Sequence, residues 1–550
     1  MLVCLIKSDM IAYVRELLKN KTFWILTALV FFGLALRLYS FSSITFGYDQ
    51  ARDAFIAQDI FLKGDLKILG PSSDIHGLHH GVLYWYLISP FYVIPYGGIF
   101  AVKLFVIVVG LLAIPLTYIL TKRMFNNSWI ALTSAFLITV SYEAISYSHW
   151  LSNPSFAFVT ILLSFLFLWM YVGENFKYGL FATAFFWGLS VQFEIFLLYQ
   201  AAVFFIILIL FRKVNIKDIF ISFVIFILVI LPLIIGEIKF GYAGALGILS
   251  FFTGYAGDRG QTVSEMVSRI YDKLFMIPYY NFFSSTGVSF VFMMLFLTAG
   301  TIYSVFLKDK RIIFLLLWFI FPVILFFTGS TNIYFVFIGC AIPLAMLTAF
   351  YLHELFIQKK AYLPCAILLL FILGSNTYLL YENKGKGEIL FSVQKDMVYD
   401  TQTKMLDFIY EEAKGKPFRI NTITNPLFIN TTWSFLFDTY GRKTYGYMPF
   451  YWGYPQDGQF GEKVEYSKDF NGSKNLIFLI HEPSGGIPDF YRNGITRFED
   501  TRSKVVKSKI FGEFRVEKRV ITADKPFLKE EVDEGIKNND LRDVKLKGLE

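Results

Sequence analysis

Long runs of apolar residues recur along the first 380 positions of the chain, separated by short polar loops. An α-helix needs about 20 mostly apolar residues to cross the hydrocarbon core of a bilayer. Eleven stretches reach or approach that length: 22–41, 98–120, 128–142, 154–172, 178–193, 195–211, 217–235, 287–307, 311–328, 333–353 and 361–381. We therefore predict a mainly α-helical polytopic membrane bundle over residues 1–381.

The pattern changes near residue 382 to that of a water-exposed domain. Residues 402–413 have helical spacing, whereas 418–423 and 476–480 are short apolar runs typical of strands. Residues 503–521 alternate like a β-hairpin. We predict a soluble α/β domain over 382–550, with a charged tail after about residue 525.

Basic residues fall in every second loop of the bundle, which orients it in the membrane. Lys and Arg precede the first span and recur in alternate loops, whereas Asp and Glu gather in the others. The positive-inside rule then predicts a cytoplasmic N-terminus and an extracytoplasmic C-terminal domain in the plasma or inner membrane. Because topology accounts for the net charge of +8, no nucleic-acid partner is needed.

The loop after the first span carries a compact group of charges. Asp49, Arg52 and Asp53 are three and four residues apart, so a helix would place them on one face. Arg37 lies nearby inside an apolar span, where a charge suggests function. Two simpler interpretations remain open: a solvated helix with a local ion pair, and an Arg37 side chain that extends to the interface.

Further polar side chains occupy the same predicted side of the membrane. They are His79, His80 and Tyr84 in the first loop, Glu143, His149 and Asn153 between the third and fourth spans, Glu194 after the fifth, and Glu237, Lys239 and Arg259 after the seventh. Taken singly, each could be a polar cap at the interface. The histidine spacing is not specific for zinc.

Several motifs resemble one enzyme family. They are the first-loop Asp motif, His-His-Gly-x-Leu-Tyr-x-Tyr (79–86) followed by Ser-Pro, and SYSHWLSNPSF (146–156). Gly-Leu-x-x-Gln-Phe-Glu (188–194) and Pro-x-x-x-x-Glu-x-Lys-x-Gly (232–241) belong to the same set. Together they resemble glycosyltransferase family 39 of the GT-C superfamily, the dolichyl-phosphate-mannose-protein mannosyltransferase-like group that includes aminoarabinose transferases.

The resemblance implies an inverting membrane enzyme. Such an enzyme moves a sugar from a polyprenyl-phosphate carrier to a protein, lipid or glycan acceptor on the extracytoplasmic side. Asp49 matches the family's first-loop Asp, which implies a general base or an acceptor-positioning residue. Asp53 is the second catalytic candidate.

The chemistry of such a substrate fits the remaining candidates. A phosphate headgroup needs cations, and Arg offers a bidentate fork. We therefore assign Arg37, Arg52, His79, His80, Lys239 and Arg259, with Tyr84, His149, Asn153 and Glu194, to donor-phosphate or substrate binding. A divalent metal ion held by Glu143 and Glu237 could bridge to the phosphate, and no other cofactor is expected.

Two other classes of function compete with this interpretation. A secondary transporter or lipid-carrier translocase would also bury ionisable residues, but usually near the bilayer midplane in repeated halves. The acids here gather at one face and no repeat is evident. A non-catalytic scaffold that presents the C-terminal domain would leave the polar first loop unexplained.

Overall fold

The computed structural model describes residues 20–73, 75, 77–94, 98–211, 215–252, 268, 274–325, 334–454, 464–465 and 475–523. It divides into two compact units, each described by itself. The first comprises the described residues of Met1–Phe41, Leu66–Leu87 and Lys103–Glu382, and the second those of Ser42–Asp65, Ile88–Val102 and Asn383–Glu550. The predicted boundary at 381/382 did not foresee the two early segments of the second unit.

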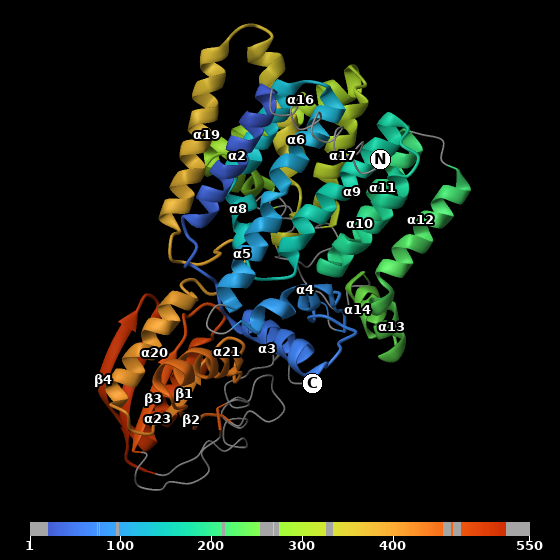
Figure 1. The fold of residues 1–550 in the computed structure, drawn as a ribbon. Helices are drawn as coiled ribbons and strands as arrows, with labels where there is room; N and C mark the ends of the chain where they lie inside the picture. The colour runs from blue at the N-terminus through green and yellow to red at the C-terminus, as the bar shows by residue number, and fades with distance from the viewer. Residues whose placement is uncertain are drawn as a thin grey trace, which may run out of the picture. The chain divides into compact units, whose positions relative to one another are not determined.

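The first unit is helical (Figure 1). Its elements are α2 (Lys21–Leu38), α6 (Ala113–Phe125), α7 (Ser128–Val140), α8 (Tyr142–His149), α9 (Pro154–Glu174), α10 (Gly179–Phe193), η1 (Ile195–Tyr199), α11 (Gln200–Phe211), α12 (Ile216–Val229), α13 (Leu231–Lys239), α14 (Ala243–Phe252), α16 (Thr286–Thr301), η2 (Ile302–Phe306), α17 (Lys310–Leu325), η4 (Tyr334–Phe337), α18 (Ala341–Leu352), η5 (His353–Ile357) and α19 (Tyr362–Glu382). The unit boundaries fall within α4 (Leu83–Tyr92) and α5 (Gly98–Leu111).

Each of the eleven predicted spans overlaps one or more helices in the described residues. In the described part of the chain, five helices are long and apolar enough to cross a membrane, or seven if each of two bent pairs is one span. Three shorter apolar helices, Gly179–Phe193, Ile195–Phe211 and Ala341–Ile357, fall below that length. The mainly helical membrane architecture is therefore confirmed, while the count of eleven crossings stays a prediction.

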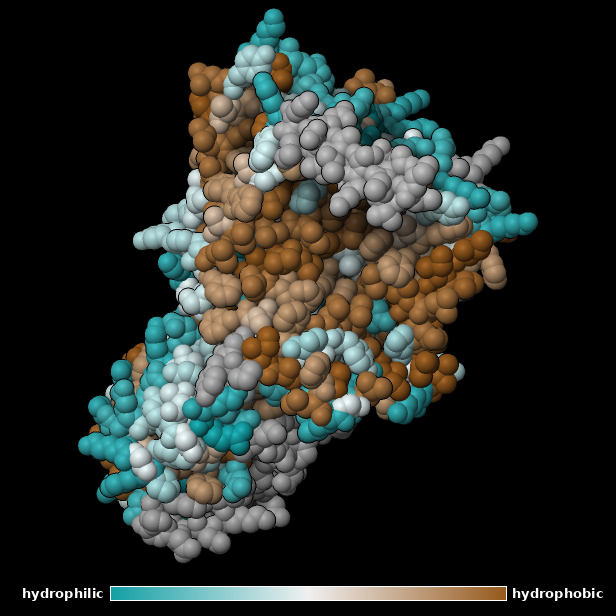
Figure 2. All heavy atoms as spheres, in the orientation of Figure 1, coloured by the Kyte–Doolittle hydropathy of each residue, from teal (hydrophilic) through white to brown (hydrophobic). Residues whose placement is uncertain are grey.

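Two helices break where the sequence interrupts their hydrogen bonding. The α7–α8 pair bends by 55° at Ser141, whose backbone leaves the helical region and whose Oγ accepts a hydrogen bond from Ala144 N at 3.0 Å. The α12–α13 pair bends by 64°, and Pro232 in the first turn of α13 has no N–H to donate. On the face seen in Figure 2, the surface of the helical unit is largely hydrophobic.

The second unit contains a five-stranded sheet with helices. Its elements are α3 (Tyr48–Lys63), α20 (Tyr399–Ala413), β1 (Arg419–Ile423), α21 (Thr431–Leu436), η6 (Phe437–Gly441), α22 (Arg442–Tyr445), β2 (Phe450–Tyr451), β3 (Leu476–His481), α23 (Asp489–Arg502), β4 (Ser503–Phe511) and β5 (Phe514–Ile521). The strand order is β2-β1-β3-β5-β4, parallel among β1, β2 and β3 and antiparallel at β5 and β4. The predicted α/β domain and its hairpin are confirmed, and the predicted tail lies outside the described residues.

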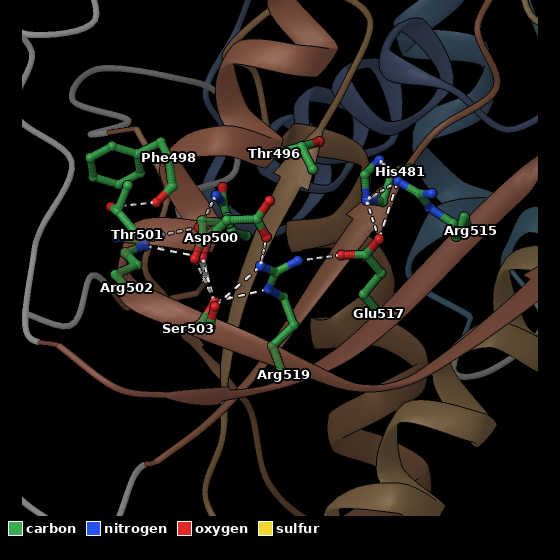
Figure 3. A network of polar contacts seen from close by, with 12 residues as sticks. His481, Thr496, Phe498, Asp500, Thr501, Arg502, Ser503, Arg515, Glu517 and Arg519 are labelled. Atoms are coloured by element: carbon green, nitrogen blue, oxygen red, sulfur yellow. Dashed lines mark hydrogen bonds and ion pairs between the residues drawn. The ribbon is translucent and has the colours of Figure 1, made fainter.

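Charged side chains of the strands β3 and β5 and of the helix α23 form a connected network (Figure 3). Arg519 donates to Ser503 Oγ at 2.9 Å and to Glu517 Oε2 at 2.6 Å, and it also contacts Asp500. Glu517 Oε1 lies 3.1 Å from Arg515 Nη2 and 3.5 Å from His481 Nε2. Arg519, Glu517 and His481 are buried, and their partners on neighbouring elements link β5 to β3 and to α23.

Glu482 gives the soluble domain a measurable pH dependence. Burial raises the pKa of this carboxyl to about 7, although Asn425 N, Trp433 Nε1 and Gln394 Nε2 donate to it and oppose that shift. A pKa raised in the folded state means that stability is fully present below the unfolded pKa of 4.5 and is lost as pH rises to about 7.

We expect Glu482→Gln to remove this dependence, because glutamine does not titrate. The unfolding free energy of the unchanged protein relative to the variant should fall by about 3 kcal/mol over that interval. Thermal unfolding of both proteins at matched pH values measures the difference, in which contributions from His481 cancel. A difference that stays constant with pH would contradict the assignment.

Candidate active site

Arg37 is a fully buried guanidinium in the last turn of α2. Its Nε donates to Ser148 Oγ at 2.9 Å, and its Nη1 donates to the carbonyl of Gly33 at 3.1 Å. Its Nη2 has no hydrogen-bond partner among the described residues, and no carboxylate of the described chain forms an ion pair with it. A buried cation without a counter-charge is costly, so we expect the Arg37 guanidinium to bind an anion.

Gly33 and two residues of α8 determine the position of the Arg37 side chain. A Cβ on Gly33 would lie 2.6 Å from Ile114 Cδ1 and 3.3 Å from Arg37 Nη1, so a larger residue would crowd the guanidinium. Ser148 Oγ donates to the carbonyl of Ala144 at 2.8 Å, which leaves its oxygen free to accept from Arg37. His149 Nε2 lies 2.7 Å from the backbone oxygen of Arg37. Two predicted site residues, Arg37 and His149, therefore meet.

The first-loop histidines and the end of α10 form a second pairing. His80 Nδ1 accepts from Ile195 N at 3.3 Å and lies 3.6 Å from Glu194 Oε1. Gly81 N donates to the carbonyl of Gln192 at 2.8 Å, which fixes the loop against the helix end. The two motifs at 79–86 and 188–194 are thus neighbours, although they are over 100 residues apart in the chain.

Three other candidates lie around this pairing. Asn153 Nδ2 donates to the carbonyl of Phe193 at 2.5 Å, beside Glu194. The buried Tyr84 ring lies 5.8 Å from that of Phe156. His79 is partly buried, with Nδ1 3.2 Å from the carbonyl oxygen of Gly77.

Glu143 and Glu237 have separate surroundings. Glu143 is fully buried in the first turn of α8, and its Oε2 accepts from Asn281 Nδ2 at 2.6 Å and Tyr334 Oη at 2.8 Å. Glu237 Oε2 accepts from Ala245 N at 3.1 Å. No group of three His, Cys, Asp or Glu side chains in the described chain is placed to hold a metal ion. The metal therefore stays a prediction.

The cations expected after the seventh span are less well defined. Lys239 is exposed near the end of α13, and its Nζ lies 5.5 Å from the centre of the Phe240 ring. Arg259 lies outside the described residues.

Asp49, Arg52 and Asp53 form the predicted cluster on α3, in the second unit. Arg52 Nη1 donates to Asp49 Oδ1 at 2.7 Å, and its Nε and Nη2 donate to Asp53 Oδ1 at 3.0 and 2.8 Å. Burial alone would lower the pKa of Arg52, but the charges of Asp53 and Asp49 raise it above its ordinary value. The Asp49 side chain is 62% exposed and that of Asp53 only 1%, so Asp49 is the carboxylate that a substrate can reach.

The C-terminal domain holds α3 in place. The Phe435 ring lies 5.3 Å from that of Phe46 and 5.1 Å from that of Phe55, on either side of the charged turn. Gln402 Nε2 donates to the carbonyl of Phe46 at 2.8 Å. Residues 383–550 therefore hold the helix that carries Asp49.

Three polar residues of the first unit were missed by the sequence reasoning. Lys103 is fully buried in α5, and a lone lysine within an apolar span was its available signal. Asn281 and Tyr334 lie in stretches without any motif, and they are distinguished only by their contact with Glu143.

Comparison with solved structures identifies the fold. ArnT from Cupriavidus metallidurans bound to undecaprenyl phosphate matches with a TM-score of 0.59 at 11% identity, covering 91% of this chain and 98% of that chain. Its apo state matches with a TM-score of 0.56 at 13% identity, over 90% and 97% of the two chains. This chain has the GT-C fold. At such identities the GT-C likeness concerns the fold alone. No protein-family profile and no curated protein matches the sequence.

Proposed function

We propose that the protein is an integral-membrane glycosyltransferase that moves a sugar from a polyprenyl-phosphate donor to an acceptor on the extracytoplasmic face. The buried Arg37 carries this proposal, because its unpaired Nη2 and missing counter-charge favour an anionic ligand. A phosphate that reaches such a site from the lipid would bring an apolar tail with it. A polyprenyl phosphate has both parts.

The structural comparison supports the same ligand class. ArnT, which shares the fold over most of both chains, was crystallised with undecaprenyl phosphate. The likeness favours a transferase over the transporter or lipid-carrier translocase considered from the sequence. The positive loops favour an N-terminus in the cytoplasm, and cysteine labelling of the first loop in intact cells would test this orientation.

We propose Asp49 as the base of an inverting transfer. The acceptor oxygen attacks the anomeric carbon on the side opposite the phosphate, while the bond from that carbon to the phosphate oxygen breaks. The electron pair leaves with the polyprenyl phosphate, and the acceptor proton passes to the Asp49 carboxylate. Phosphate is a good leaving group, so no strong general acid is required.

We assign Arg52 a positioning role instead of the phosphate contact expected from the sequence. Its Nε, Nη1 and Nη2 all donate to Asp49 or Asp53, which together outweigh its charge. The buried Asp53 fixes Arg52, and Arg52 fixes the exposed Asp49. We retain His79, His80, Tyr84, His149, Asn153, Glu194, Lys239 and Arg259 as proposed substrate-binding residues.

Mass spectrometry of lipids that co-purify with the protein tests this function. We expect a polyprenyl phosphate, free or carrying one sugar, in the purified sample. Incubation with envelope membranes should then release the unsugared carrier. A preparation that carries only bulk phospholipid and transfers no sugar would refute the proposal.

A further inference from the structure

Among the described residues, Glu143 has no counter-charge that would explain its burial. The carboxylate is fully buried, and its Oε1 has no hydrogen-bond partner among the described residues. No Lys, Arg or His of the described chain forms an ion pair with it. Glu194, equally buried, differs because His80 lies 3.6 Å away. A fully buried ionisable group without a charged partner among the described residues suggests a ligand.

The surrounding residues hold Glu143 in one orientation. Asn281 Nδ2 and Tyr334 Oη both donate to Oε2, which leaves Oε1 as the oxygen that can still accept. Asn281 is fixed in turn, because its Oδ1 accepts from Ser141 Oγ at 2.5 Å and its carbonyl accepts from Asn376 Nδ2 at 2.9 Å. A network that satisfies one carboxylate oxygen and leaves the other open presents a single hydrogen-bond acceptor.

This acceptor faces away from the Arg37 site. Glu143 and Ser148 are five residues apart on α8, which turns their side chains by about 140° around the helix axis. Ser148 contacts Arg37, whereas Glu143 contacts Asn281 and Tyr334. The phosphate site at Arg37 and the open oxygen of Glu143 therefore belong to different sides of α8.

Aromatic rings lie beside Tyr334, the tyrosine that donates to Glu143 Oε2. The Tyr280 ring lies 5.8 Å from that of Tyr334 and 5.9 Å from that of Tyr142, with which it stacks. Flat apolar faces around a few fixed polar groups are the usual composition of a site for a small polar molecule.

We propose that Glu143, held by Asn281 and Tyr334, binds a hydrogen-bond donor group of the sugar acceptor, a hydroxyl or an ammonium. The proposal rests on the transferase function proposed above and adds the acceptor side to it. The donor phosphate and the acceptor are then recognised on different faces of α8, by an unpaired cation and an unpaired carboxylate.

Glu143→Gln is the informative change. Glutamine keeps the length, and its oxygen can still accept from Asn281 and Tyr334, but an N–H₂ group replaces the open Oε1. A donor would therefore face a donor. We expect the acceptor concentration for half-maximal transfer to rise about tenfold or more, with maximal rate and donor dependence little changed. Tyr334→Phe, which frees Oε2 and keeps the ring, should shift the same parameter less.

The experiment titrates each substrate separately with reconstituted protein. The donor probe is the sugar-carrying lipid that co-purifies with the unchanged protein. The acceptor probe is envelope membrane from cells that lack this protein. Retention of the carrier lipid by both variants reports that they are folded. Addition of ammonium or of a simple polyol as competitor separates the two acceptor chemistries.

The outcomes distinguish the two proposals. An acceptor shift in Glu143→Gln with an unchanged donor dependence supports the acceptor assignment. Normal transfer with an unchanged acceptor dependence, or a shift confined to the donor, overturns it and leaves the transferase function standing. Absence of transfer by the unchanged protein overturns both.

Discussion

Asp49→Asn is expected to lower the maximal rate of sugar transfer by about 10² to 10⁴-fold, the usual contribution of a positioned general base. Asparagine has nearly the same shape but cannot take the acceptor proton. Arg52 would keep its two hydrogen bonds to Asp53, so α3 should retain its local structure. Transfer of labelled sugar to envelope membranes at saturating donor measures the rate.

Asp59→Asn is the matched control for this change. Asp59 lies on the same helix and forms a surface ion pair with Lys63 at 2.8 Å, a kind of contact that contributes little. We expect normal transfer from this variant and normal carrier binding from both. An Asp49→Asn protein that transfers sugar at the unchanged rate would exclude Asp49 as the base.

Arg37→Met should separate ligand binding from protein stability. Loss of charged hydrogen bonds to the phosphate should weaken carrier retention by roughly 10- to 100-fold. The lipid-free protein should be no less stable than before, because an apolar side chain replaces a buried unpaired charge. Ser148 remains hydrogen-bonded to Ala144, so the change leaves no new unsatisfied hydroxyl.

Quantitative mass spectrometry of the co-purified carrier and thermal unfolding after delipidation measure the two effects. Arg123→Met is the control, since Arg123 pairs with Glu174 at 2.5 Å on the surface and should not affect the carrier. If Arg37 is structural, the Met variant will unfold at a lower temperature while keeping its lipid. That pattern would count against an anion site at Arg37.

Local patterns explain why so much of the fold could be predicted. The apolar spans and the alternating 503–521 hairpin can be recognised from the local periodicity of the sequence, which does not depend on any distant contact. The three-residue spacing of Asp49 and Arg52 likewise predicted their ion pair, because a helix alone determines it.

Long-range contacts explain what could not be predicted. Phe46 and Phe55 pack on Phe435, nearly 400 positions later, and nothing in the first loop signals that partner. The open oxygen of Glu143 depends on Asn281 and Tyr334, whose own sequence neighbourhoods carry no motif. The missing counter-charge of Arg37 is also visible only once its neighbours are known.

The second unit is assembled from three separate stretches of chain. It therefore cannot be expressed, or exchanged between related proteins, as one continuous segment. A gene fragment starting at residue 383 would encode the sheet without Phe46, Phe55 and Tyr92, the rings that pack around Phe435. That ring, now 2% exposed, would face water. The domain is therefore not a portable module: any exchange between relatives would have to carry 42–65 and 88–102 along with it.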